Sequence, residues 1–110
     1  MENPVRITFR HLEPSEPLRK HIEQESSKLE EFFTPIIDCH VVIDLPNRSA
    51  QGGQPYRVRV EVQVPGDRIV GGVDPSPLDK SRQDAFMAVT EAFDNAQREL
   101  KDYAQRIRGY

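Results

Sequence analysis

The sequence predicts an α+β fold with the order β-α-β-β-β-α, in which two helices pack on one face of a four-stranded sheet. Four short segments alternate apolar and polar residues, which is the pattern of strands with one buried face. Two longer segments repeat apolar residues every three or four positions, which is the pattern of amphipathic helices. The chain has 110 residues. We therefore expect one domain, 1–110, with a core large enough to need no disulfide or metal.

The first strand and the first helix follow from local patterns. Residues 5–11 alternate apolar and polar side chains, which predicts a half-buried strand. Ser15 is a favourable N-cap residue and Pro17 suits a first helical turn, so a helix is expected to follow. Pro35 disfavours helical backbone in the residue before it, which predicts a helix over 16–33. The predicted buried face of this helix consists of Leu18, Ile22, Leu29, Phe32 and Phe33.

Three more strands are predicted in the middle of the chain. The first spans 36–45, and the second, at 56–64, alternates valines with charged and polar residues. A Pro-Gly-Asp sequence at 65–67 is typical of a tight turn, so the segment 68–73 is expected to return as the second arm of a hairpin. The two glycines at 71–72 suggest a bulge in this last strand.

The last predicted helix spans 79–108. Its apolar residues recur at alternating spacings of three and four, which indicates one face buried on the sheet. This stripe consists of Phe86, Val89, Phe93, Ala96, Leu100, Tyr103 and Ile107.

Composition limits the possible functions. Fifteen lysines and arginines stand against 18 aspartates and glutamates, a net charge of −3. Proteins that bind nucleic acid usually carry a basic excess, so any such binding here requires a local basic patch. The single cysteine, Cys39, cannot form an internal disulfide, and no apolar run suits a signal peptide or a membrane span. We therefore expect a cytoplasmic protein with no membrane partner.

No group of residues predicts a catalytic or metal site. Cys39 and His40 are neighbours on a predicted strand, so they point to opposite faces and cannot share a metal without distortion. The serines lie in no nucleophile-elbow motif, and neither glycine pair precedes a helix as a phosphate-binding loop would. We therefore predict a binding protein, with no metal, cofactor or small-molecule substrate. An uncharacterised enzyme is the third-ranked interpretation.

Polar stripes on the two helices are the candidate binding surface. At 100° per residue, basic and amide side chains align along one flank of each helix. On the first helix the stripe consists of Lys20, Gln24 and Lys28, and on the last helix of Arg98, Lys101, Gln105 and Arg108. These stripes form either a cationic groove or ordinary solvated faces with ion pairs between successive turns.

The order and spacing of several segments resemble the ribosome hibernation family, which includes the short hibernation-promoting factor and the ribosome-associated inhibitor A. The match spans about residues 5–105. The segments are ITFRH at 7–11, PLRKHI at 17–22, KLEEFF at 28–33, HVVI at 40–43, VEVQVPGD at 60–67, AFMAV at 85–89 and QREL at 97–100.

The resemblance implies a protein of the stress response that binds the small ribosomal subunit. Family members occupy the channel used by mRNA and tRNA and block translation in idle ribosomes, and their basic helix residues contact rRNA phosphates. The corresponding rRNA-binding residues here are Lys20, Lys28, Arg98, Lys101 and Arg108. Longer family members carry a further C-terminal domain for ribosome pairing, and we expect this chain to lack it.

Four residues differ from the charge pattern that the resemblance implies. Glu25 and Glu31 in the first helix, and Asn95 and Asp102 in the last, stand near positions where relatives tend to have lysine or arginine. The alternative function is therefore a protein-interaction or stress-regulatory module on the same fold that has lost rRNA binding.

Overall fold

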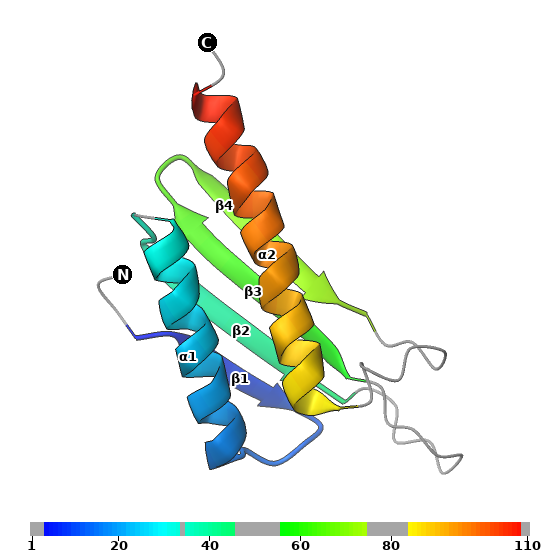
Figure 1. Ribbon diagram of the computed structural model, residues 1–110. Coiled ribbons are helices and arrows are strands. Elements are labelled where there is room, and N and C mark those ends of the chain that lie inside the picture. Colours follow the sequence, from blue (N-terminus) through cyan, green and yellow to red (C-terminus); the bar gives the residue numbers. More distant parts are fainter. Residues whose placement is uncertain (1–3, 34, 46–55, 75–83, 109–110) are drawn as a thin grey trace.

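The structure is a computed structural model that describes residues 4–33, 35–45, 56–74 and 84–108. Its elements follow the predicted order β-α-β-β-β-α (Figure 1). They are β1 (Arg6–Arg10), α1 (Glu16–Phe32), β2 (Asp38–Asp44), β3 (Arg57–Val64), β4 (Asp67–Val73) and α2 (Ala85–Arg108).

The four strands form one sheet in the order β1-β2-β3-β4. β1 and β2 are parallel, because α1 crosses over between them, and the other two pairs are antiparallel. Figure 1 shows both helices on the same face of this sheet, with their axes running in similar directions. The predicted fold class is therefore confirmed.

The core lies between the sheet and the two helices. Alternate residues of β2 and β3 point into it, and the strict period of two explains why valines dominate these strands. The largest fully buried side chains include Ile22 from α1, Ile43 from β2 and Leu100 from α2. The opposite face of the sheet carries the polar half of each strand.

α1 begins and ends close to where the sequence predicts. The Ser15 hydroxyl accepts a hydrogen bond from the Leu18 amide at 3.4 Å, and Phe33 leaves helical geometry with φ −140° while its amide still donates to Leu29 O. One prediction for this helix is wrong: Phe32 is 44% exposed, because it lies in the last turn. Phe33 is partly buried against the core.

α2 begins at Ala85. The Asp84 carboxylate caps the helix, accepting hydrogen bonds from the amides of Phe86 at 2.8 Å and Met87 at 3.3 Å. The prediction that this helix starts at residue 79 is wrong at Asp84, which precedes the first helical residue. Residues 79–83 lie outside the described residues. Phe86 and Ile107 are exposed, contrary to the predicted stripe, because they lie near the two ends of a helix that projects beyond the sheet at its C-terminal end (Figure 1).

The glycine pair in β4 does not form a bulge. The register between β3 and β4 is continuous through Gly71 and Gly72. A Cβ atom at Gly71 would lie 2.4 Å from the backbone nitrogen of Ala96 in α2. Glycine is needed here because α2 approaches the strand closely, and Ala96 is the small residue on the facing side.

Among the described residues, none of the helices combines the length and the apolar character that crossing a membrane requires.

Candidate functional site

A groove of about 750 Å³ lies between the C-terminal end of α1 and the C-terminal half of α2. Aromatic side chains form one wall, and charged and amide side chains from α2 form the other. The lining residues are Phe32, Phe33, Asp94, Gln97, Arg98, Lys101, Ala104 and Gln105. The predicted polar stripe of the last helix therefore borders a real concavity.

Contacts between α1 and α2 fix the position of this groove. Towards the N-terminal end of α2, His21 Nε2 and Thr90 Oγ1 form a hydrogen bond of 2.8 Å, and the His21 ring lies 5.5 Å from the Phe86 ring. Beside the groove, the Phe33 and Tyr103 rings meet edge to face at 5.8 Å. Aromatic pairs of this geometry contribute more stability than their buried area alone would give, so this pair helps to fix α1 and α2 relative to each other beside the groove.

A further contact anchors α2 to the hairpin. The Tyr103 hydroxyl donates a 2.8 Å hydrogen bond to Pro65 O in the β3–β4 turn. Gly66 takes the positive φ of 85° that this tight turn requires. The C-terminal half of α2 is thus held in place where it lines the groove.

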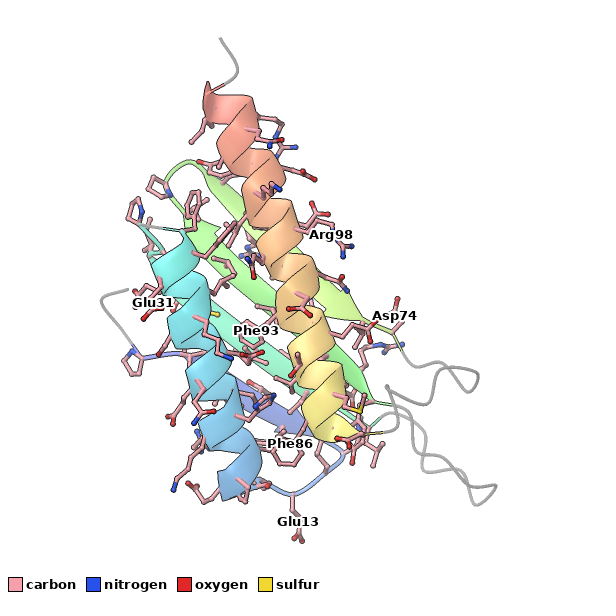
Figure 2. The ribbon with its side chains drawn as sticks, in the orientation of Figure 1. Glu13, Glu31, Asp74, Phe86, Phe93 and Arg98 are labelled. Carbon is pink, nitrogen blue, oxygen red and sulfur yellow. The ribbon has the colours of Figure 1, made fainter. Side chains whose placement is uncertain are left out.

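The structure brings two of the five predicted binding residues together. Arg98 and Lys101 both line the groove and are exposed. Figure 2 shows Arg98 pointing to solvent from α2, whereas Phe93 lies between the two helices. Lys20 is exposed on α1 but does not line the groove, and the side chain of Arg108 lies outside the described residues.

Lys28, the remaining predicted residue, is already paired. Its Nζ atom lies 3.1 Å from Oε2 of Glu25, one turn earlier in α1. The Lys28 side chain is 76% exposed, whereas that of Glu25 is 9% exposed. The Glu25 carboxylate therefore partly neutralises the charge of Lys28, although Glu25 itself is nearly buried.

Two of the residues that depart from the family charge pattern have different surroundings. Asn95 is partly buried, and its amide donates a 2.9 Å hydrogen bond to Gly72 O, so it joins α2 to β4. Glu31 is exposed on α1, and Figure 2 shows it on the outer side of that helix. Of these two, Glu31 is the one that adds negative charge to the exposed surface of α1.

Sequence reasoning missed part of the groove wall. Helical spacing predicts that Phe32 lies in the core, and Gln97 lies outside the predicted stripe, yet both residues line the groove. The sequence signal that could have indicated an exposed Phe32 is the predicted helix end near residue 33. An apolar side chain in the last turn of a helix can lie past the edge of the surface that the helix packs on.

The remaining reactive side chains have structural surroundings. Burial raises the pKa of the Cys39 thiol to about 12. His40 lies on the other face of β2, and its Nε2 is 2.8 Å from Thr8 Oγ1. In the described part of the chain, no three histidine, cysteine or acidic residues are grouped to hold a metal ion.

Sequence comparisons identify relatives along nearly the whole chain. The family described as sigma 54 modulation protein / S30EA ribosomal protein matches residues 5–108. The chain is 26% identical over 103 residues to a ribosome hibernation promotion factor of Deinococcus radiodurans, covering 91% of this chain and 48% of that protein. It therefore spans about half the length of that relative. It is 22% identical over 102 residues to a ribosome hibernation promoting factor of Pseudomonas putida, covering 93% of this chain and 87% of that protein.

Solved structures share the fold. The Protein Y N-terminal domain of Thermus thermophilus superposes with a TM-score of 0.69 at 19% identity, covering 92% of this chain and 98% of that one. A ribosomal subunit interface protein from Coxiella burnetii superposes with a TM-score of 0.70 at 17% identity, covering 91% and 96%. The matching family is non-enzymatic, in agreement with the prediction of a binding protein. The chain belongs to the sigma 54 modulation protein / S30EA ribosomal protein family.

Proposed function

We propose that this chain is a cytoplasmic ribosome hibernation factor that binds the small ribosomal subunit at the mRNA/tRNA channel and stops translation. The observation that carries the proposal is the groove between α1 and α2, with Arg98 and Lys101 on one wall. The names of the curated relatives, which are ribosome hibernation factors, support the same function. Folded RNA is recognised largely through its shape, phosphates and 2′-hydroxyls, which suits a cationic helical surface.

The five cations have different roles in this proposal. Arg98 and Lys101 contact rRNA phosphates from the groove, and Arg108 adds a further cation about two turns beyond Lys101 in α2. Lys20 contributes from the exposed side of α1. Lys28 binds most weakly of the five, because Glu25 lies 3.1 Å away and competes with phosphate.

Charge reversal tests the site. We expect the double substitution Arg98→Glu and Lys101→Glu to weaken pelleting with purified small subunits at least tenfold, because it turns attraction to rRNA phosphates into repulsion. Arg106→Glu is the matched control, since it is exposed on the opposite flank of the same helix and should change binding little. Cell-free translation should be slowed by the wild type and the control, and not by the double variant.

Glu31 gives a test of opposite sign. Glu31→Lys should raise the affinity, because it replaces exposed negative charge on α1 with a positive charge that attracts rRNA phosphates. Glu25→Lys is unsuitable for this purpose, since Glu25 is buried and the substitution would place an unpaired charge beside the core. The site would be wrong if the double variant pelleted as well as the wild type, or if Arg106→Glu weakened binding equally.

One observation favours the alternative of a protein-interaction module. α1 carries five acidic and three basic residues, which is an unusual balance for an rRNA-binding helix. If the wild-type chain neither pellets with small subunits at low salt nor slows translation, this alternative becomes the better account. An affinity pull-down would then identify the protein partner.

A further inference from the structure

The face of the sheet opposite the helices concentrates arginine. Among the described residues, no element covers this face, and the alternation along the strands places five guanidinium groups on it against three carboxylates. By contrast, α1 and α2 together carry nine acidic and seven basic residues. The basic residues on the open face of the strands are Arg6, Arg10, Arg57, Arg59 and Arg68, the acidic residues there are Asp38, Asp44 and Glu61, and Asp74, directly after β4, pairs with Arg57. Basic residues therefore outnumber acidic residues on this face of the strands, although the chain as a whole is acidic.

Strand register gathers three of these arginines around one pocket. Asp44 in β2 pairs with Arg10 in β1 on one side and Arg57 in β3 on the other, and Val42 pairs with Arg59. These residues, together with His40 and Glu61, line a hollow of about 350 Å³. Three guanidinium groups from two strands thus border a single concave site.

The guanidinium groups of this pocket are accessible. Arg57 Nε lies 3.6 Å from Asp74 Oδ1 and Arg59 Nε lies 3.1 Å from Glu61 Oε1, yet both arginine side chains are more than half exposed. Solvent-exposed pairs of this kind stabilise little, so another anion can replace the carboxylate. Arg10 forms no ion pair with any described residue.

Both carboxylates that line the pocket have partners, since Glu61 pairs with Arg59 and Asp44 contacts His11. Asp44 Oδ1 lies 2.7 Å from His11 Nδ1, and the Asp44 side chain is only 10% exposed. His11 takes a positive φ of 59° at the end of β1. Asp44 is therefore held by His11 and is not a free surface carboxylate.

We propose that this open sheet face binds the phosphodiester backbone of RNA, with the pocket of Arg10, Arg57 and Arg59 at its centre. Guanidinium groups donate paired hydrogen bonds that match phosphate oxygens. The arginines are distributed over β1, β3 and β4, so a ligand with regularly repeated charges fits them better than a single anion. The outward-facing residues of the four strands include no phenylalanine or tyrosine, so binding does not depend on base stacking or sequence.

This surface is separate from the groove between the helices, because it lies on the opposite side of the sheet (Figure 1). A protein with both surfaces would contact two RNA segments at once. The sheet-face proposal does not depend on ribosome binding, since it can be tested with a short RNA alone.

The experiment measures fluorescence anisotropy of a labelled 20-nucleotide polyuridine RNA with the full chain at several salt concentrations. Each arginine that faces a phosphate adds about 0.7 to the slope of log affinity against log salt. We expect the double substitution Arg57→Gln and Arg59→Gln to lower the slope by about 1.4, and Arg10→Gln to lower it by about 0.7. Arg106→Gln on α2 is the control and should leave the slope unchanged, and thermal unfolding checks that each variant is folded.

Two results would overturn the proposal. In the first, the variants of the sheet face bind RNA as the wild type does, while Arg98→Gln with Lys101→Gln removes binding. RNA would then bind only at the groove between the helices. In the second, polyglutamate displaces RNA from the wild type as effectively as unlabelled RNA of equal charge. The face would then recognise acidic protein segments and not phosphate.

Discussion

At the scale of single residues, the alternation along a strand decides which side chains are chemically accessible. Cys39 and His40 are neighbours in β2, yet Cys39 is buried among core residues and His40 contacts Thr8 on the open face. On the same open face, the hydrogen bond from Arg6 to Asp38, 2.6 Å long, holds the pKa of that carboxyl group below its ordinary value. The two faces therefore differ in chemistry, one being inert and the other charged.

The Cys39 thiol gives a prediction at this scale. Burial raises the pKa of this thiol to about 12, so the thiol stays protonated at pH 8, and the side chain is also shielded from reagents. Ellman's reagent should therefore react negligibly with the native chain over minutes and should titrate one thiol after denaturant is added. Reaction of the native chain at the rate of free cysteine would show that β2 is not packed as described.

At the scale of elements, the strands were predictable because each alternates with a period of two and one face is buried. β3 is the clearest case, since its valines all point to the core. Helix ends were harder to predict, because they depend on where the partner surface stops. Phe32 and Phe86 match the helical period but lie beyond the surface that would cover them.

The candidate site was predictable only in part. The flank of α2 that contains Arg98 and Lys101 followed from helical geometry, and these residues do border a groove. The pairing of Glu25 with Lys28 spans one turn and was within reach of sequence reasoning, but the burial of Glu25 depends on tertiary packing. The arginine pocket of the open sheet face requires the register of three strands, which no local pattern supplies.

Gly71 tests the close packing of α2 on β4. In Gly71→Ala, the new Cβ would lie 2.4 Å from Ala96 N and 2.5 Å from Ala96 Cα, so the helix or the strand must move. We expect a loss of about 1–3 kcal/mol in the free energy of unfolding, measured with urea. Val70→Ala, at an exposed neighbouring position, should cost less than about 1 kcal/mol. Equal losses would contradict the close approach.

Phe93 and Phe86 form a matched pair on α2, since the sequence pattern places both in one stripe. Phe93 is 4% exposed and Phe86 is 43% exposed. Phe93→Ala should therefore lower the free energy of unfolding by about 3–5 kcal/mol. Phe86→Ala should lower it by at most about 1.5 kcal/mol, because it removes mainly the contact with the His21 ring. Similar losses in thermal or urea unfolding would mean that the helix is rotated.

At the scale of the whole molecule, a chain of net charge −3 carries two groups of basic residues on opposite sides of the sheet. One is the groove between the helices, with Arg98 and Lys101, and the other is the open sheet face with its arginines. Overall charge is therefore a poor guide to the partners of this protein. Local patches govern what it binds, provided that the partner reaches within about 10 Å of them, the screening distance at 0.1 M salt.

The most direct test of the proposed function is the affinity of the unmodified chain for purified small ribosomal subunits, measured across a range of salt concentrations. Each cation that faces an rRNA phosphate releases a counterion, so binding should be clear at low salt. Log affinity should fall with log salt at a slope steeper than about −1.4, the value for two phosphate contacts. No binding at low salt, or an affinity that does not change with salt, would contradict the account.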